Sequence, residues 1–335
     1  MTAALTWARL SYRQQRWELI LIVIGVAAVA GAMLWFSQQL TGMVAASPDC
    51  LPPAIDELPA SCSQLLQAYY ETSAFADNLL VLSFAAPFGM GVLLGAPLVA
   101  REIDSGTAQL AWSLGRSRIG WLLRRIAFIA LAAVVLLAVL AYTSELLAAA
   151  MAPDRNLSQD FTWFGRRGWL IVARGLGALM LGMAVGALIG RVLPAILAAG
   201  LVIAVAFTGI SLAMDEWHHR EAVPQRFMAA PNEPGDFDMG ALAVDYGIQL
   251  RGGELVSYGD LYRRGVTTQI SDEQGRSYAS EADYEAGNFI GYDVQMVIPG
   301  ERYPELVARE GAVVGALALL ALGLTAAIVR RRRPL

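Results

Sequence analysis

The sequence contains no lysine, because all 25 of its basic residues are arginine. It therefore lacks the Walker A phosphate loop, whose lysine reaches the β- and γ-phosphates of a nucleotide, and any lysine for a Schiff base. If this protein uses ATP, another chain must bind and hydrolyse it. Charged residues are also scarce, at 16% of the 335 residues, where a soluble domain usually has about a quarter. This composition excludes a soluble enzyme, a collagenous chain and a disordered chain.

Hydrophobic residues make up 56% of the chain and are concentrated in long runs. A membrane-spanning helix needs about 20 mostly apolar residues. Eighteen residues precede the first run, and its length and aromatic end favour an uncleaved span over a signal peptide. The sequence predicts six spans, at residues 19–36, 79–100, 126–144 with an extension to 152, 168–190, 192–214 and 311–329. Nothing in it predicts a nucleic-acid partner.

Arginines beside the spans predict the orientation, since positive residues concentrate in cytoplasmic segments. With the N-terminus inside, the inside segments carry 13 arginines and three acids, a net charge of +10. The first outside loop, residues 37–78, has five acids and no arginine, whereas the second, residues 153–167, opposes the trend with three arginines. We expect a multi-pass protein of the plasma membrane, in contact with the lipid bilayer and with both termini in the cytoplasm.

Residues 215–310 are too long and too polar to be a simple connection between spans. They hold 18 acids and eight arginines, a net charge of −10. The segments 248–251, 254–258 and 292–297 alternate apolar and polar residues, as half-buried strands do. The predicted fold is therefore an all-α transmembrane bundle of six helices with an inserted extracellular domain, either α/β or mainly β, between helices five and six. Residues 311–335 supply the sixth helix and a basic tail.

Cys50 and Cys62 both fall in the first outside loop. Two cysteines on an oxidising face predict a disulfide. The alternatives are two free thiols or two metal ligands, and a metal would need further partners in a loop without histidine.

The first 18 residues form an amphipathic pattern, which predicts a helix lying in the cytoplasmic interface of the membrane. At 100° per residue, one face carries three arginines and the opposite face is apolar. The residues are Arg9, Arg13 and Arg16 on the first face, and Trp7, Leu10 and Trp17 on the second. A plain positive anchor for the first span is the alternative reading.

The inside loop of residues 101–125 is too apolar for a solvated linker and too charged to lie in lipid. Its large apolar residues are Leu110, Trp112, Leu114, Ile119 and Trp121. Because aromatic and arginine side chains together are typical of interfaces, we expect short helices that dock on the membrane face or on a cytoplasmic partner.

The loop also carries a motif. Its positions are Glu102, Gly106-Thr107, Leu110, Ser117-Arg118 and a basic residue at Arg124 or Arg125. This pattern resembles the cytoplasmic loop of ABC-2-type transporter permeases, and the segments 97–102 and 297–310 resemble actinobacterial members of that family. The sequence departs from many members at Gly115 and Arg116, where they have proline before the Ser-Arg pair.

The resemblance implies a type V permease in which six spans form one half of a transport path. A second permease copy, expected as a homodimer, and two copies of a separate ABC ATPase subunit would complete the transporter. ATP and magnesium would bind to the ATPase, leaving no cofactor, metal or catalytic site in this chain. The implied ATPase-coupling residues are Glu102, Gly106, Thr107, Trp112, Arg118 and Trp121, with Glu102 holding the loop against the spans. Because the spans hold few charged residues, we expect an amphipathic or hydrophobic substrate, such as a drug-like compound, lipid or peptide. We expect it to be moved outward.

Two ionisable residues interrupt the apolar stretches. Glu145 lies about five residues from the outer end of span three, and Arg174 about five residues into span four. Because these spans form a hairpin, we expect both at similar depth, roughly 7–8 Å inside the membrane at 1.5 Å per residue, and joined as an ion pair. A role in the substrate path and snorkelling of each side chain to the interface are the alternatives.

Glycines and prolines mark the second and fourth spans. Pro87 and Pro97 predict a bend or break in span two. The small residues permit close helix packing, within one chain in preference to a dimer face. They are Gly91, Gly95, Gly182, Gly186 and Gly190.

Two other functions compete with the permease reading. An intramembrane enzyme is disfavoured, since no helix carries a His-Glu metal motif and no Ser-His constellation is present. The adjacent His218 and His219 point about 100° apart on a helix, so we expect no metal there. A sensor or scaffold whose outer domain binds a ligand shares every topological feature of the permease.

Overall fold

The computed structural model describes residues 2–47, 49–50, 62–107, 117–226, 238–263, 270–272 and 276–331. The chain divides into two compact units, and each is described by itself. The helical unit comprises Met1–Arg155, Trp163–Thr208 and Leu306–Leu335. The sheet unit comprises Asn156–Thr162 and Gly209–Glu305.

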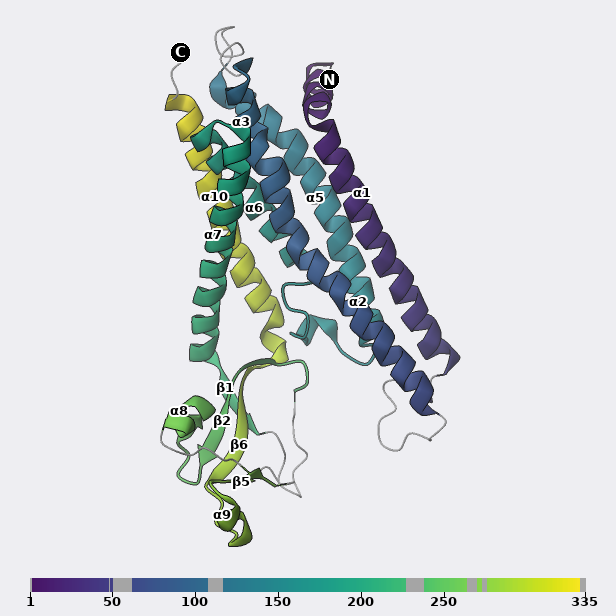
Figure 1. Cartoon of the computed structure of the whole chain (residues 1–335), viewed down its shortest axis with the longest axis vertical. Helices are drawn as coiled ribbons and strands as arrows, with labels where there is room; N and C mark the ends of the chain where they lie inside the picture. Colours follow the sequence, from purple (N-terminus) through teal and green to yellow (C-terminus); the bar gives the residue numbers. More distant parts are fainter. Residues whose placement is uncertain are drawn as a thin grey trace. The chain divides into compact units, whose positions relative to one another are not determined.

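In the part of the chain that the structure describes, six helices are long and apolar enough to cross a membrane, as predicted. The six long apolar helices that the sequence predicts are thereby confirmed (Figure 1). Their elements are α1 (Thr2–Ala46), α2 (Ser63–Met90) continuing through the π-helical turn η2 (Gly91–Gly95) into α3 (Ala96–Asp104), α5 (Arg118–Met151), α6 (Trp169–Ile189), α7 (Val192–Glu221) and α10 (Tyr303–Arg331). The amphipathic faces predicted before Arg16 concern side chains outside the described part.

The π-helical turn lies where a bend or break was predicted. Span two is continuous across it, and the Ala96 N–H bonds to the Gly91 carbonyl five residues back. Pro97 in the first turn of α3 has no N–H to continue the α-helical pattern. The helix therefore widens at this point instead of breaking, and π turns of this kind are frequent at functional sites.

Helix α6 is the most buried of the six spans and packs against η2, α3, α2 and α5. Glycines make this approach close enough for backbone contact. A Cβ on Gly182 would lie 2.2 Å from the Gly91 carbonyl oxygen, and a Cβ on Gly186 would lie 2.1 Å from that of Ala96. On the other side of the contact, a Cβ on Gly95 would lie 2.5 Å from the Leu179 oxygen. The prediction that these glycines pack helices within one chain is confirmed. Gly190 instead ends α6 with a φ of +69°.

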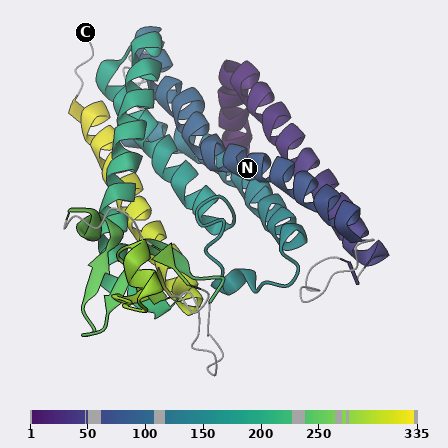
Figure 2. The same cartoon turned by 60° about the horizontal axis from the view of Figure 1, so that its bottom comes forward.

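Helix α1 packs against α5 and α2 (Figures 1 and 2). In Figure 1 the start of α1, the end of α10, the end of α3 and the start of α5 lie at one end of the helical unit. We call this the terminal end, and the opposite end, where α1 leads to α2 and α5 leads to α6, the far end.

The sheet unit contains six described strands that all pair antiparallel. Strand β6 is central, with β2 along one edge and both β1 and β5 along the other. The strands are β1 (Val223–Arg226), β2 (Leu242–Leu250), β3 (Leu255–Ser257), β4 (Ile270–Ser271), β5 (Arg276–Tyr278) and β6 (Gly291–Ile298), with the short helices α8 (Tyr258–Arg263) and α9 (Glu281–Glu285). A small sheet between helices five and six of the sequence is therefore present.

The interior of the sheet unit is part apolar and part polar. Ile248, Val256 and Leu261 form its buried apolar cluster. Nearby, the Asp293 carboxylate accepts hydrogen bonds from the Tyr258 hydroxyl at 3.0 Å and from the Ser277 hydroxyl. Burial, and then the negative charge of Asp293, raise the pKa of Tyr258. The hydroxyl therefore stays protonated and serves as a donor to the carboxylate.

Candidate functional site

Glu102 is the centre of the site that the sequence predicted for coupling. It lies near the end of α3 with only 5% of its side chain exposed. One carboxylate oxygen accepts from Arg125 Nη2 of α5 at 2.6 Å, and the other accepts from Thr107 Oγ1 at 2.7 Å. A buried carboxylate needs such partners, because taking a charge out of water is costly unless it is paired.

Gly106 explains how Thr107 reaches Glu102. Helix α3 ends at Asp104, and Gly106 follows with a φ of +72°, a conformation that favours glycine. Its N–H bonds to the Ile103 carbonyl at 3.2 Å. The chain thereby turns back, and Thr107 meets the side chain five residues before it. The Glu-x-x-x-Gly-Thr pattern is thus a helix stop that closes on its own glutamate.

The neighbours of Glu102 on α3 contact two more helices. Arg101 forms an ion pair with Glu18 of α1. Asp104 Oδ2 accepts from the backbone N–H of Val192 at 3.4 Å, at the N-terminus of α7, where an N–H lacks an intrahelical partner and a negative charge is favourable. We call Arg101, Glu102 and Asp104 the α3 hub, because these three residues reach α1, α5 and α7.

The start of α5 is fixed by the Ser-Arg pair of the motif. Ser117 Oγ accepts from the Gly120 N–H at 3.0 Å, which caps the helix. Arg118 Nη1 donates to the carbonyl of Arg330 near the end of α10, at 2.9 Å. This pair therefore links the beginning of α5 to the last described turn of the chain.

The two tryptophans of the predicted coupling set differ in what the structure describes. Trp112 lies outside the described residues. Trp121 is only 3% exposed and packs in the main core of the helical unit with Leu98 and Val99 of α3. The prediction that its side chain lies on a docking surface is wrong, because the helical period turns this position of α5 inward.

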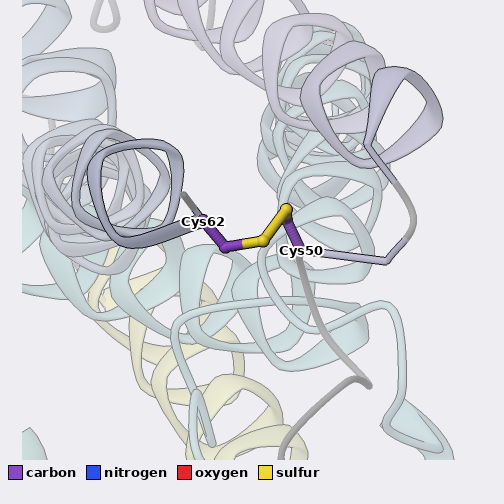
Figure 3. Close-up of a disulfide and its surroundings, with 2 residues drawn as sticks. All are labelled: Cys50 and Cys62. Atoms are coloured by element: carbon purple, nitrogen blue, oxygen red, sulfur yellow. A yellow bond between two sulfur atoms is a disulfide. The ribbon is translucent and has the colours of Figure 1, made fainter. Parts of the chain in front are cut away.

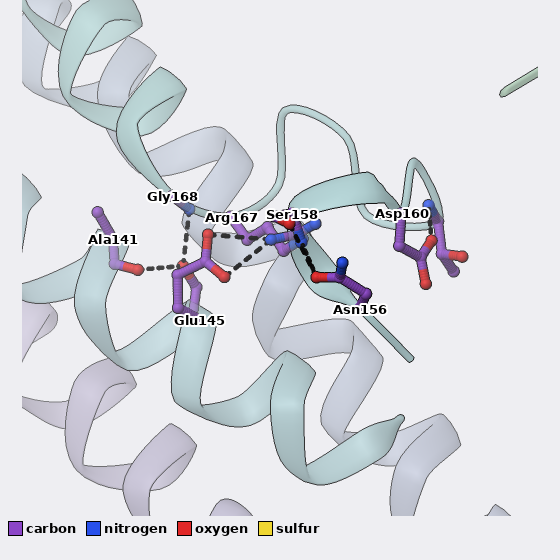
Figure 4. A network of polar contacts seen from close by, with 9 residues as sticks. Ala141, Glu145, Asn156, Ser158, Asp160, Arg167 and Gly168 are labelled. Atoms are coloured by element: carbon purple, nitrogen blue, oxygen red, sulfur yellow. Dashed lines mark hydrogen bonds and ion pairs between the residues drawn. The ribbon is translucent and has the colours of Figure 1, made fainter. Parts of the chain in front are cut away.

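The predicted pair of Glu145 with Arg174 is also wrong. Glu145 pairs with Arg167, whose Nη1 lies 2.8 Å and 3.1 Å from its two carboxylate oxygens (Figure 4). Gly168, at a φ of +70°, starts α6. The loop residue just before it thus returns to α5, while Arg174 lies further along α6.

Arg174 instead pairs with Glu310 of α10, with Nε and Nη2 at 2.6 Å and 2.5 Å from Oε1. Sequence reasoning missed Glu310 because it began the last span at Gly311, whereas α10 begins at Tyr303. Arg174 Nη1 also donates to the Gly165 carbonyl at 2.8 Å, and the guanidinium lies 5.2 Å from the centre of the Phe84 ring of α2. The pair is buried, with 12% and 8% of the two side chains exposed.

Cys50 and Cys62 form a disulfide, as predicted (Figure 3). It joins the segment after α1 to the residue that precedes α2. The bond therefore ties two spans together at the far end of the helical unit.

Among the described residues, no group of three or more His, Cys, Asp and Glu side chains is placed to hold a metal ion. His219 Nδ1 lies 2.8 Å from the backbone carbonyl of Asp215, one helical turn earlier.

Comparison with protein families decides the class of the chain. A family model described as "ABC-2 membrane transporter related" matches residues 23–215, more than half of the sequence. The chain belongs to this family. Comparison with curated proteins and with solved structures gives no match.

The ABC-2 match covers most of the first five spans and the whole α3 hub, including the loop in which the motif was recognised. This ABC-2 protein is therefore a permease component of a membrane transporter. The sheet unit beyond residue 215 and α10 lie outside the matched range. The arrangement around Glu102 consequently belongs to the part of the chain that carries the family identity.

Proposed function

We propose that this chain is the membrane-spanning subunit of an ATP-driven exporter. A separate ABC ATPase subunit, in two copies, supplies the energy, and two permease chains pair to form the path. ABC-2 family membership supports this assignment, and so does the absence of lysine, which leaves the chain without a Walker A loop. The substrate is an amphipathic or hydrophobic molecule that moves outward.

The observation that carries the coupling proposal is the α3 hub. Its three charged residues contact α1, α5 and α7 and lie at the start of the loop of residues 101–125. A force applied to the loop by a docked ATPase would act on α3 first. Because packed helices shift as rigid elements with discrete contacts, that force would be shared among three spans.

The residues of the predicted coupling set divide into two roles. Glu102, Gly106 and Thr107 position the loop through the buried carboxylate and the helix stop. Trp112 and Arg118 supply the surface that meets the ATPase, since a few aromatic and arginine side chains usually carry most of the energy of an interface.

The terminal end faces the cytoplasm, and the sheet unit lies outside the cell. The arginine distribution along the chain supports this orientation. Single-cysteine labelling in intact cells tests it. An impermeant thiol reagent should label Asn288→Cys and spare Ser113→Cys, whereas the reverse pattern would overturn the orientation.

Co-purification with the candidate ATPase tests the partner. Changing Trp112 or Arg118 to Ala should lower the amount of ATPase recovered, while the permease still inserts into the membrane. Arg191→Ala is the matched control, because it removes one exposed arginine from the α6–α7 turn, outside the loop. Equal losses in Arg118→Ala and Arg191→Ala would indicate a general charge effect. Full recovery with both loop residues changed would favour the sensor or scaffold.

A further inference from the structure

Three arginines surround two aromatic rings in the sheet unit. The Arg226 guanidinium lies 4.5 Å from the centre of the Tyr292 ring. Arg251 and Arg276 lie 3.9 Å and 5.8 Å from the centre of the Phe289 ring. The two rings are 5.4 Å apart and edge to face. We call these five residues the Arg–aromatic cluster.

The strand register brings the cluster together. Arg226 of β1 is the pairing partner of Val294, and Arg276 of β5 is the partner of Tyr292. Directly paired residues share a face of the sheet, as do residues two apart on one strand. Arg226, Arg276 and Tyr292 therefore lie on the same face. Arg251 arrives just after β2, where its backbone N–H bonds to the Ile290 carbonyl at 3.3 Å.

The cluster is a local excess of positive charge in an acidic region. Residues 215–310 carry 18 acids and only eight arginines, yet three of those arginines meet here. Asp272 pairs with Arg276 at 2.6 Å, and this hydrogen bond raises the pKa of Arg276. Among the described residues, Arg226 and Arg251 have no carboxylate within ion-pair distance, and both are exposed.

Guanidinium groups held over aromatic rings are suited to a particular ligand. The ring attracts the cation by its face, and the planar fork keeps N–H groups free to bind a carboxylate or phosphate through two parallel hydrogen bonds. Phe289 and Tyr292 are only partly buried. They therefore offer apolar surface beside the positive charge.

We propose that the Arg–aromatic cluster binds an acidic amphipath, with the phosphate or carboxylate on Arg226 and Arg251 and the apolar body on the two rings. This ligand is the transported substrate. That identity rests on the proposed function, whereas the binding itself does not. The occupant is a dissolved molecule, not a bilayer lipid. The net charge of −10 over residues 215–310 opposes docking on an anionic bilayer surface.

The test is calorimetric titration of the full chain in nanodiscs of phosphatidylcholine, without any ATPase. The probes are 2-naphthyl phosphate, its neutral counterpart 2-naphthyl glucoside, and inorganic phosphate. We expect 2-naphthyl phosphate to bind at one site per chain, and at least about tenfold more tightly than either of the others, because hydrogen bonds to charged groups and apolar contact both contribute.

Variants locate the binding in the cluster. Arg226→Gln and Arg251→Gln should each weaken it about tenfold, and Tyr292→Leu should weaken it less. Arg226→Lys keeps the positive charge and loses the planar guanidinium. It therefore tests whether binding needs two parallel hydrogen bonds, in a variant whose fold should change little. Arg263→Gln and Tyr262→Leu are the matched controls in α8, since both side chains are at least 70% exposed. They should bind like the unchanged protein.

Several outcomes would overturn the proposal. Unchanged affinity in the Arg226→Gln, Arg251→Gln double variant would remove the site, and so would equal binding of the neutral glucoside. Competition by phosphatidylglycerol placed in the nanodisc would assign the cluster to lipid headgroups. Because no ATPase is present, a failure here leaves the permease assignment intact. Loss of ATPase co-purification would likewise leave this site untouched.

Discussion

The two ends of the helical unit hold their helices together in different ways. At the terminal end, the short helix α3 carries three polar residues that reach α1, α5 and α7, with Glu102 and Arg125 only 5% and 4% exposed. At the far end, the ion pairs involve separate side chains. Arg166 with Asp77 ties the loop before α6 to α2. Arg167 with Glu145 ties a loop to α5, and Arg174 with Glu310 ties α6 to α10.

At the terminal end the contacts share one short helix, α3, whereas at the far end they belong to separate side chains. A change at Glu102 alters what α3 can transmit to several spans, because the contacts share one short helix. A change at Arg174 affects its pair with Glu310, its hydrogen bond to the loop at Gly165 and its contact with the Phe84 ring of α2. Coupling should therefore depend on the terminal end, and the far end should contribute mainly stability.

The largest expected effect on stability comes from removing Arg174, the partner of Glu310, at the far end. Arg174→Ala leaves the Glu310 carboxylate buried without its cation, and removing one member of a buried pair typically costs about 3–5 kcal/mol. The measurement is the free energy of unfolding in detergent, obtained by denaturant titration.

Double-variant cycles check the pairing itself. Arg174→Gln combined with Glu310→Gln should cost clearly less than the sum of the two single changes. Arg174→Gln combined with Glu145→Gln should be additive, since these residues have different partners. Coupling in the second cycle and additivity in the first would restore the pairing expected from the sequence.

A smaller effect is expected where α3 begins. Gly186→Ala places a Cβ 2.1 Å from the Ala96 oxygen, so α6 and α3 must separate. Overpacking of this kind costs about 1–3 kcal/mol. The control is Gly31→Ala in α1, where a Cβ meets nothing within 4 Å. Thermal unfolding of the two variants should differ, and an equal response would show that the close approach is not present in solution.

The smallest effect on global stability is expected from the disulfide. Alkylation of the denatured, non-reduced protein should leave Cys50 and Cys62 unmodified, whereas two reactive thiols would contradict the bond. Removing a disulfide from a small secreted domain costs about 2–5 kcal/mol. Here two spans already anchor the loop. The Cys50→Ser, Cys62→Ser variant should therefore unfold near the normal temperature while proteolysis of the loop increases.

The sequence predicted the spans well because long apolar runs depend only on local composition. It placed the start of the last helix too late, because Glu310 interrupts the apolar pattern even though the helix continues through it. The ion pairing was wrong for the same reason, since the true partner of Arg174 had been assigned to the outer domain. Charges that pair inside a bundle cannot be matched from depth alone.

Other parts of the site depend on contacts far apart in the chain. The strands around residues 248, 256 and 294 were visible as alternating patterns. The Arg–aromatic cluster was not visible, because it requires β1 and β5 to pair with the same strand. Trp121 was assigned to a surface because it lies among arginines, whereas the face of α5 that packs on α3 decides its burial.

The central claim is that the α3 hub transmits the action of the ATPase to the spans. Spin labels at Leu123→Cys on α5 and Leu193→Cys on α7, both more than half exposed, report the separation of two helices that the hub contacts. Adding a non-hydrolysable ATP analogue with magnesium to the permease–ATPase complex should change this distance by on the order of 2 Å or more. The control is Asp77→Asn on α2 at the far end, where Asp77 accepts from Trp163 Nε1 at 2.9 Å. It should show the same distance change as the unchanged protein. In Glu102→Gln the ATPase should remain bound, but the ATP analogue should not change the distance. If the analogue changes the distance in Glu102→Gln as much as in the unchanged protein, the account is contradicted.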